Sequence, residues 1–274
     1  MSKTVLITGG NSGIGKATAV GIAKTGATVV IGCRDKKRGE AAVAEIKKAS
    51  GNNNVEMLQM DLASQHSVRN AVEEFKKKHN RLDVLINNAG VFLKNREVTE
   101  DGLEKTFATN YLSHFLLTHL LLDTLKASAP SRIVNVASMH NGVKINFDDL
   151  QTEKNYSFMK AVGPTKLGMI MFTQELAKKL QGTGVTVNSL HPGLAKSNIL
   201  NDVSGFVKFI FRLMSTSPEK CAETSIFLAT SPDVEKVNGK YFIKKKEAKA
   251  GANATNEADI KQLWDVSMKL AKLG

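Results

Sequence analysis

Near its N-terminus the chain reads Thr8-Gly9-Gly10-Asn11-Ser12-Gly13-Ile14-Gly15, between an apolar run at residues 4–8 and a helical pattern at residues 14–25. Glycines allow a backbone to approach a pyrophosphate closely, and a helix N-terminus offers free N–H groups and a positive dipole. The strand before the glycines and the helix after them are the context that a dinucleotide-binding turn requires. The sequence therefore predicts a nucleotide-binding βαβ unit, with these residues around the phosphates: Gly9, Asn11, Ser12, Gly13, Ile14 and Gly15.

Short β-rich runs alternate with longer helical patterns along the rest of the chain. Several short runs are continuously apolar, which is typical of strands buried on both faces of a parallel sheet. Strands are expected at residues 4–8, 28–33, 55–60, 83–87, 132–136, 185–190 and 240–243. Helices are expected at residues 14–25, 36–50, 65–79, 99–127, 158–181 and 218–229. This order predicts an α/β fold, a Rossmann-like doubly wound parallel sheet of about seven strands with helices on both faces.

Composition limits the classes of protein that fit. The chain has 274 residues, 42% of them hydrophobic, and no linker-like shift in composition, so we expect residues 1–274 to form a single domain. The formal net charge of +12 comes mostly from lysines scattered on helix faces, without a nucleic-acid-binding motif, so no nucleic acid partner is expected.

The location of the protein is predicted from three features. Two cysteines, Cys33 and Cys221, fit a reducing compartment. The leucine-rich stretch at residues 115–125 is too short to span a membrane, and an expected strand begins almost directly after Met1. We therefore expect a cytoplasmic protein without a signal peptide or a transmembrane segment.

The end of the second expected strand distinguishes NAD from NADP, because an acid there binds the ribose 2′-hydroxyl and a base accommodates a 2′-phosphate. The chain reads Val30-Ile31-Gly32-Cys33-Arg34-Asp35-Lys36-Lys37-Arg38 at this point. Asp35 has the spacing of an NAD-type acid, but it lies beyond the strand, where we interpret it as a helix N-cap. Cys33 occupies the position of the acid, and Arg34 and Arg38 can hold a phosphate. We therefore expect NADP(H) rather than NAD(H).

Two apolar segments fall outside the strand–helix alternation. At about residues 198–217 a helical stripe contains Phe206, Phe209, Ile210, Leu213 and Met214. Core packing is the ordinary explanation of such a stripe, but a segment after the sixth strand of this fold overhangs the sheet edge where ligands bind. Together with Phe92 and Leu93, it suggests a lid over a lipophilic substrate. The second segment is a C-terminal helix at about residues 256–272, with Trp264 on its apolar side.

Further motifs follow the glycine turn in a characteristic order. They are Asp61-Leu62, Asn87-Asn88-Ala89-Gly90, Asn110, Ser138, Lys166 and Pro192-Gly193. With the turn at residues 8–15 they resemble the short-chain dehydrogenase/reductase family over almost the whole chain. The stretches at residues 110–118, 146–150, 172–177, 183–193 and 263–267 are most similar to its branch of retinol dehydrogenases and carbonyl reductases. Members of that branch often carry an N-terminal membrane anchor, which is not expected here.

The resemblance implies a role for each of these motifs. Asp61 and Leu62 would border the adenine, and the stretch from Asn87 through Asn88 and Ala89 to Gly90 would support the cofactor wall. The segment from Pro192 and Gly193 to Ser197 would contact the nicotinamide. Ser138 would hydrogen-bond the substrate oxygen, Lys166 would hold the nicotinamide ribose, and Asn110 would position Lys166 through water. No metal is implied, and relatives often assemble as dimers or tetramers through their long helices.

The chain departs from the family at Val162. Relatives carry Tyr-x-x-x-Lys, whereas this segment reads Ala161-Val162-Gly163-Pro164-Thr165-Lys166. Residues four apart share a helix face, so Lys166 should touch position 162. In the family the lysine lowers the pKa of the tyrosine, whose phenol exchanges a proton with the substrate; an isopropyl group cannot do this. Pro164 is a second departure, because a proline beyond the first turn of a helix removes a backbone hydrogen bond and kinks it.

Three residues are candidates for the missing proton donor. Ser138 can polarise a carbonyl, but its hydroxyl is a poor acid. Tyr156 lies six residues before Val162 and reaches the site only if its loop folds over. His140 titrates near neutrality and can serve as an acid.

These observations predict an NADP(H)-dependent oxidoreductase acting on a lipophilic aldehyde, ketone or enone, with a non-standard or impaired proton donor. Reduction of an activated C=C bond suits such a site, because the proton can come later from solvent. The alternative is a redox-silent NADP(H)-binding homologue: a non-redox cyclase or isomerase, a regulator, or an engineered inactive variant. The sequence leaves this alternative open.

Overall fold

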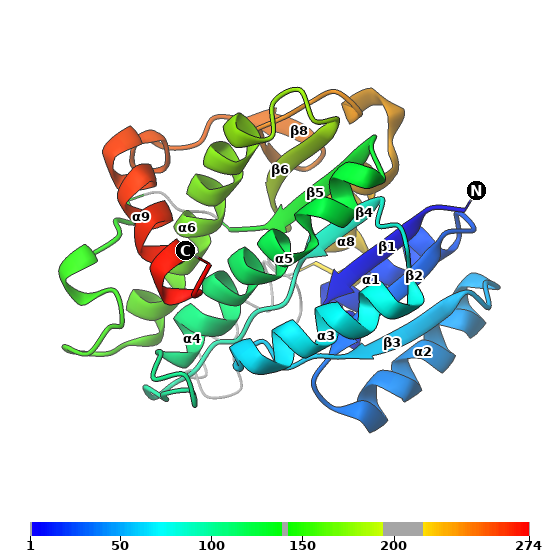
Figure 1. Cartoon of the computed structure of the whole chain (residues 1–274), viewed down its shortest axis with the longest axis horizontal. Coiled ribbons are helices and arrows are strands. Elements are labelled where there is room, and N and C mark those ends of the chain that lie inside the picture. Colours follow the sequence, from blue (N-terminus) through cyan, green and yellow to red (C-terminus); the bar gives the residue numbers. More distant parts are fainter. Residues whose placement is uncertain (1, 139–141, 194–215, 274) are drawn as a thin grey trace.

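The computed structural model describes residues 2–138, 142–193 and 216–273. In these ranges eight strands form one sheet, in the order β3-β2-β1-β4-β5-β6-β7-β8 (Figure 1). Their bounds are β1 Thr4–Thr8, β2 Thr28–Cys33, β3 Val55–Gln59, β4 Val84–Asn87, β5 Ser131–Val136, β6 Val185–His191, β7 Tyr241–Ile243 and β8 Lys246–Ala248. Strands β1 to β7 are parallel, and the strand order reverses between β1 and β4. A sheet of this kind binds its ligand at that reversal, outside the carboxyl ends of the strands.

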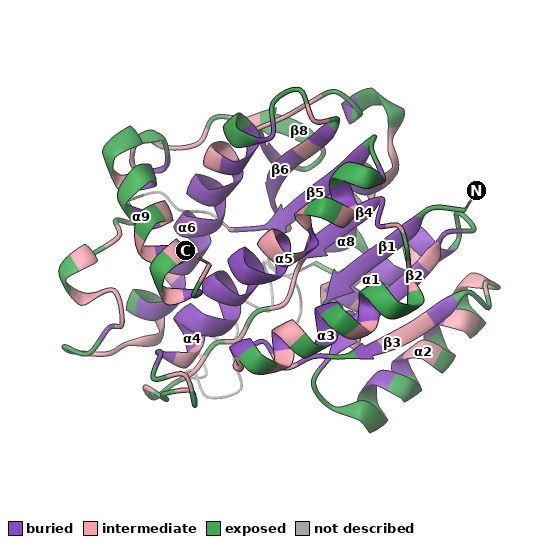
Figure 2. Cartoon of the chain, viewed as in Figure 1, coloured by how far each residue is buried: buried purple, intermediate pink, exposed green. Residues whose placement is uncertain are grey.

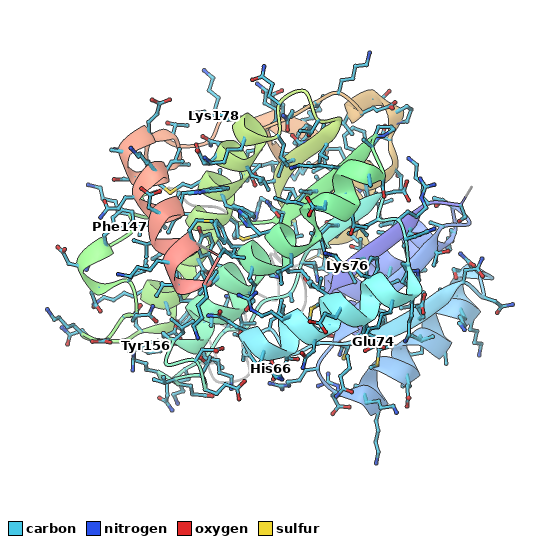
Figure 3. The ribbon with its side chains drawn as sticks, in the orientation of Figure 1. His66, Glu74, Lys76, Phe147, Tyr156 and Lys178 are labelled. Carbon is cyan, nitrogen blue, oxygen red and sulfur yellow. The ribbon has the colours of Figure 1, made fainter. Side chains whose placement is uncertain are left out.

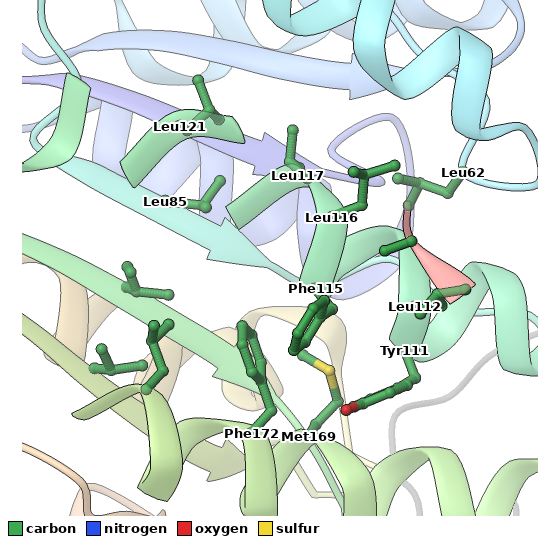
Figure 4. Close-up of a cluster of buried hydrophobic side chains, with 14 of the residues drawn as sticks. Leu62, Leu85, Tyr111, Leu112, Phe115, Leu116, Leu117, Leu121, Met169 and Phe172 are labelled. Atoms are coloured by element: carbon green, nitrogen blue, oxygen red, sulfur yellow. The ribbon is translucent and has the colours of Figure 1, made fainter. Parts of the chain in front are cut away.

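Helices cover both faces of the sheet, whose strands are largely buried (Figure 2). Their bounds are α1 Gly13–Ala23, α2 Lys36–Ser50, α3 Gln65–Lys78, α4 Lys105–Phe107, η1 Ala108–Leu112, α5 Ser113–Ala127, α6 Phe158–Lys179, α8 Pro218–Thr230 and α9 Glu257–Leu270. One core lies under α1, α2 and α8, and the other lies under α3, α5 and α6, with α9 packed outside α6. In the second core the rings of Phe115 in α5 and Phe172 in α6 have centroids 5.0 Å apart (Figure 4).

The structure confirms the expected α/β class and the doubly wound parallel sheet. The apolar runs became central strands because a strand between two helical layers is buried on both faces. The N-cap interpretation of Asp35 is also confirmed, since its Oδ1 accepts a hydrogen bond of 2.9 Å from Arg38 N. None of the helices in the described ranges is both long and apolar enough to cross a membrane.

Two predicted elements differ from the structure. The polar segment after β7 contains an eighth strand, because Lys244 and Lys245 adopt positive φ angles of 50° and 64° and turn the chain into an antiparallel hairpin. Lysine rarely adopts this conformation, so the sequence carries no turn signal there. The helix predicted at residues 99–127 begins only at Lys105, because the carboxylate of Glu104 caps it by accepting from Thr106 N and Phe107 N.

Candidate cofactor site and active site

The glycine turn joins the end of β1 to the N-terminus of α1. Gly9 and Gly13 have positive φ angles of 66° and 52°, which glycine adopts without strain. A Cβ on Gly15 would lie 2.2 Å from Gly9 O and 2.5 Å from Asn88 Nδ2, so only glycine lets α1 approach the strands this closely. The side chain of the N-cap Ser12 makes no capping hydrogen bond, which leaves N–H groups of the first turn free for a ligand. This geometry fits a pyrophosphate.

The wall opposite the turn is held by Thr8, the last residue of β1. Its Oγ1 accepts hydrogen bonds of 2.9 and 3.0 Å from Asn88 N and Ala89 N, and its carbonyl accepts from Asn88 Nδ2. Burial lowers the pKa of His114 to about 3, so this ring is neutral. Its Nε2 lies 3.0 Å from Thr8 Oγ1 and its Nδ1 lies 3.3 Å from Asn110 O. Because the carbonyl oxygen of Asn110 can only accept, the His114 proton is assigned to Nδ1, and Nε2 then accepts from the Thr8 hydroxyl. Sequence reasoning missed His114.

The residues expected to select the cofactor lie where predicted, between the end of β2 and the first turn of α2. Cys33 Sγ donates to Asp35 O at 3.2 Å, and burial raises the pKa of this thiol. The side chains of Arg34 and Arg38 are exposed. Neither guanidinium forms an ion pair with a carboxylate in the described part of the chain, so both are available to an anion.

The expected adenine border is formed by ordinary local contacts. Asp61 Oδ1 accepts from Ala63 N at 2.9 Å, while Leu62 is buried in the core and its carbonyl accepts from Ser113 Oγ. These contacts hold the loop after β3 in place, but they do not themselves identify an adenine site.

Asn110 lies in the π-helical turn η1 and is fully buried. Its side-chain amide bonds both backbone groups of Val91, accepting from Val91 N at 2.7 Å and donating to Val91 O at 2.9 Å. Its side chain therefore fixes the loop after Gly90. A Cβ on Gly90 would lie 3.4 Å from Asn110 Oδ1 and 3.6 Å from Lys166 Nζ, so the side chains of Asn110 and Lys166 both lie close to this glycine.

Lys166 is a buried cation beside Gly90 and Asn110. Its Nζ donates to Val136 O at 3.1 Å, and burial lowers its pKa to about 8. An ammonium has three N–H donors, and the hydrogen bond to Val136 is the one that it forms within the described residues. Ribose hydroxyls would satisfy the remaining donors, so the lysine fits the role that the family implies for it.

The desolvated ammonium leads to a prediction about stability. Below about pH 8 both the folded and the unfolded chain carry the Lys166 proton, and the folded state bears the full cost of burying it. Between pH 8 and the ordinary lysine pKa of 10.5 the folded chain binds fewer protons than the unfolded chain, so this cost is relieved as the pH rises. We expect Lys166→Met to raise the free energy of unfolding at pH 7 by about 3 kcal/mol.

Urea denaturation of both proteins at several pH values measures this effect. The advantage of the variant should shrink by about 1.4 kcal/mol per pH unit above pH 8. A variant that is less stable at pH 7, or an advantage independent of pH, would mean that the ammonium is well solvated or well paired.

Val162 and Ser138 occupy the positions at which the family resemblance places the proton donor and the serine that binds the substrate oxygen. Val162 is buried in α6, four residues before Lys166. Ser138 lies two residues past the end of β5, and its carbonyl accepts a hydrogen bond of 2.9 Å from Tyr241 Oη. Tyr241 was not among the predicted site residues, because the tyrosine lies 103 positions away in the sequence. Pro164 lies within α6 beyond its first turn, since the helix begins at Phe158.

Tyr156 is committed to other partners. Its hydroxyl donates to Leu93 O at 3.0 Å and lies 3.4 Å from Thr106 Oγ1, in the loop that precedes α6 (Figure 3). Burial raises its pKa further. To act as a proton donor, this phenol would have to leave Leu93. His140, the other predicted substitute, lies outside the described residues.

The predicted nicotinamide and substrate contacts are described only in part. Pro192 and Gly193 directly follow β6 and are half-buried, and Gly193 has a φ angle of 90°. Phe92 is 41% exposed beside the cofactor wall, where an apolar ligand can reach it. The remaining predicted residues lie outside the described ranges: Ser197, Phe206, Phe209, Ile210, Leu213 and Met214.

Comparison with known proteins agrees with this geometry. Residues 3–206 match the family described as short chain dehydrogenase. Human retinol dehydrogenase 14 is 45% identical over 97% of this chain and 85% of its own length. A crystal structure of an uncharacterized protein from Mycobacterium paratuberculosis has a TM-score of 0.80 at 30% identity, covering 98% of this chain and 93% of that one.

A further neighbour was solved with its cofactor. The Pseudomonas aeruginosa RhlG/NADP complex has a TM-score of 0.72 at 26% identity, covering 88% of this chain and 93% of that one. The fold, the glycine turn and these relatives agree, and the RhlG neighbour was solved with NADP. The chain therefore belongs to the short-chain dehydrogenase family, in its retinol dehydrogenase-like branch.

Proposed function

We propose that the chain is an NADP(H)-dependent oxidoreductase that acts on a lipophilic aldehyde, ketone or enone. The buried ammonium of Lys166 is the observation that carries this proposal. It lies beside Gly90 at the carboxyl edge of the sheet, with one hydrogen bond to the described protein. A buried cation with unused donors requires a polar ligand, and the hydroxyls of a nicotinamide ribose are such a ligand.

The cofactor site is assigned residue by residue. Bound NADP(H) would supply or accept a hydride at its nicotinamide. The glycine turn from Gly9 to Gly15 would bind the pyrophosphate through backbone N–H groups. Arg34 and Arg38 would bind the 2′-phosphate, for which the exposed, unpaired guanidinium groups are suited.

The proton on the substrate oxygen is the weak point of the reaction. At Val162 the family's phenol is replaced by a hydrocarbon, and the Tyr156 hydroxyl is bound to Leu93 O. Ser138 would donate a hydrogen bond to the oxygen on which negative charge develops. We therefore propose a slow reductase, and favour enones, because their reduction is completed by protonation of carbon from solvent.

A redox-silent NADP(H)-binding homologue is the second candidate, favoured by the same hydrocarbon at Val162. NADPH absorbance in the presence of nonanal, 2-nonanone, β-ionone and retinal, with product analysis, separates the two. A reductase consumes NADPH with at least one of these compounds. Binding without any consumption of NADPH, or conversion of a compound without it, contradicts the proposed reductase.

The choice of NADP(H) gives a prediction of its own. We expect Arg34→Ala and Arg38→Ala each to weaken NADPH binding by about tenfold or more, because a charge-assisted hydrogen bond contributes about 1.5–3 kcal/mol. NADH binding should hardly change. Fluorescence titration measures both, with Lys37→Ala as the control for loss of a neighbouring positive charge. Equal losses for NADPH and NADH, or for all three variants, would show that the arginines do not recognise the 2′-phosphate.

We further propose one cofactor-binding domain over residues 1–274, a lid at about 198–217 and a cytoplasmic homo-oligomer. Helix α9 bears on the last point, because the ring of Trp264 packs at 5.1 Å from that of Phe115 in α5. Helix α9 thus covers part of the surface of α5 and α6, and a second copy that packed on these two helices would have to lie beside α9. Size-exclusion chromatography with light scattering would give the number of subunits.

A further inference from the structure

His191, the last residue of β6, carries a buried nitrogen that the proposed reaction does not yet use. The residue is 8% exposed. Its Nδ1 is shielded from solvent and has no hydrogen-bond partner among the described residues. Burial lowers the pKa of the ring, so the imidazole is neutral near pH 7. An unpaired buried polar atom costs about 1–3 kcal/mol, and such a cost is commonly retained where a ligand supplies the partner.

The sheet register brings His191 level with Ala137, the residue before Ser138. Val136 of β5 pairs with Leu190 of β6, and Ala137 N donates to Leu190 O at 2.9 Å. His191, the next residue of β6, is therefore level with Ala137 and lies beside the peptide that leads into Ser138. His191 and Ser138 both lie at the carboxyl edge, where this fold binds its ligand.

The side chain of His191 is on the α6 face of the sheet. Side chains alternate along a strand, so His191 shares its face with Val187, four residues earlier. Val187 belongs to the core that contains the residues of α6, and so does Tyr241, whose hydroxyl holds Ser138 O. Lys166 Nζ reaches Val136 O from α6 on this same side. His191 thus lies on the side of the sheet that carries the proposed chemistry.

We propose that His191 is a further substrate-binding and catalytic residue, whose Nδ1–H donates a hydrogen bond to the carbonyl oxygen of the substrate held at Ser138. This inference rests on the proposed function. A neutral imidazole is a good donor to an oxygen that gains negative charge, because it does not give up its proton. Two donors, the hydroxyl of Ser138 and the ring of His191, then stabilise the oxyanion or enolate, and the final proton comes from solvent. In this way the site partly compensates for the missing phenol.

Two substitutions of His191 distinguish the effect of losing Nδ1 from the effect of changing the ring. His191→Asn keeps a polar group near the position of Nδ1, whereas His191→Phe keeps the ring shape without any nitrogen. We measure β-ionone binding by calorimetry in saturating NADP⁺, under which no reduction occurs. We expect His191→Phe to weaken binding about tenfold, in keeping with one lost hydrogen bond. His191→Asn should remain within about threefold of the wild type, because an amide donor replaces the ring donor.

Thermal unfolding of the free proteins distinguishes binding from structure. Removing an unpartnered nitrogen should leave the Tm of His191→Phe equal or higher, whereas removing a structural histidine would lower it. The control is His119→Phe. His119 is another largely buried histidine, but its Nδ1 already lies 2.8 Å from Phe115 O, so this variant should leave β-ionone affinity unchanged.

Three results would contradict the role of His191, and one would contradict the reductase alone. Unchanged β-ionone affinity in His191→Phe, a lowered Tm in that variant, or no binding of β-ionone by the wild type would each overturn the assignment of His191. If β-ionone binds through His191 but no compound of the panel oxidises NADPH, the reductase fails and the role of His191 in binding stands.

Discussion

Val162→Tyr should raise the rate of NADPH-dependent reduction by about 10² to 10⁴, because this is the usual contribution of a positioned general acid. Position 162 lies one helical turn before Lys166, on the same face of α6. Lys166 is a buried cation with donors to spare, so a phenol beside it would have a lowered pKa and a path for its proton. The measurement is kcat and KM for the best compound of the panel.

Val162→Phe is the matched control for this experiment. Phenylalanine adds nearly the same volume to a buried position, and shares the overpacking cost of about 1–3 kcal/mol, but it has no hydroxyl. We expect a gain in kcat for the tyrosine variant alone. If the two variants have equal rates, position 162 does not face the substrate oxygen. If the wild type is already as fast as Val162→Tyr, another group, such as His140 or Tyr156, delivers the proton.

Gly15→Ala should reduce the affinity for NADPH by about 10- to 100-fold and the free energy of unfolding by about 1–3 kcal/mol. The new Cβ would lie 2.2 Å from Gly9 O and 2.9 Å from Gly9 C, both of which are backbone atoms that cannot rotate away. It would also lie 2.5 Å from Asn88 Nδ2, which holds Thr8 O. Either α1 or the cofactor wall must move, and both carry groups assigned to the cofactor.

Gly26→Ala separates this clash from the general loss of a glycine. Gly26 follows α1 with a φ angle of 81°, and a Cβ there meets nothing within 4 Å. Its cost should be backbone strain of about 1–2 kcal/mol, without any change in NADPH affinity. Fluorescence titration and urea denaturation of both variants test the difference. Undiminished NADPH binding by Gly15→Ala would mean that the cofactor does not rest on this turn.

The proposed site combines groups of two kinds. Lys166 and His191 are buried polar groups whose burial costs stability in the free protein. Gly15 and Asn110 cost nothing of this kind, since they shape the walls through backbone approach and paired amide hydrogen bonds. Substitutions should therefore fall into two groups. Substitutions at Lys166 and His191 should weaken ligand binding or activity but leave stability equal or higher. Substitutions at Gly15 should lower both cofactor affinity and stability.

Much of the architecture was predictable because its causes are local in sequence. The glycine turn, the apolar runs of β1 to β7 and the N-cap at Asp35 each depend on a few neighbouring residues, so their signals survive without tertiary information. The role of Lys166 stays a prediction with a different basis, since it rests on the order of motifs along the whole chain that resembles a known family. The hairpin at Lys244 and Lys245 carried no local signal, and it was missed.

The polar contacts of the site depend instead on distant residues. His114 meets Thr8 across 106 positions, and Tyr241 meets Ser138 across 103. His191 becomes level with Ala137, the residue before Ser138, through the β5–β6 register. No pattern within one strand or helix encodes such pairs, because they arise where crossover connections place separate strands side by side. The amino-acid sequence alone determined the sheet, the glycine turn and the valine at position 162. The folded sheet determined which histidines and which tyrosine lie beside the proposed site, because only packing brings these distant residues together.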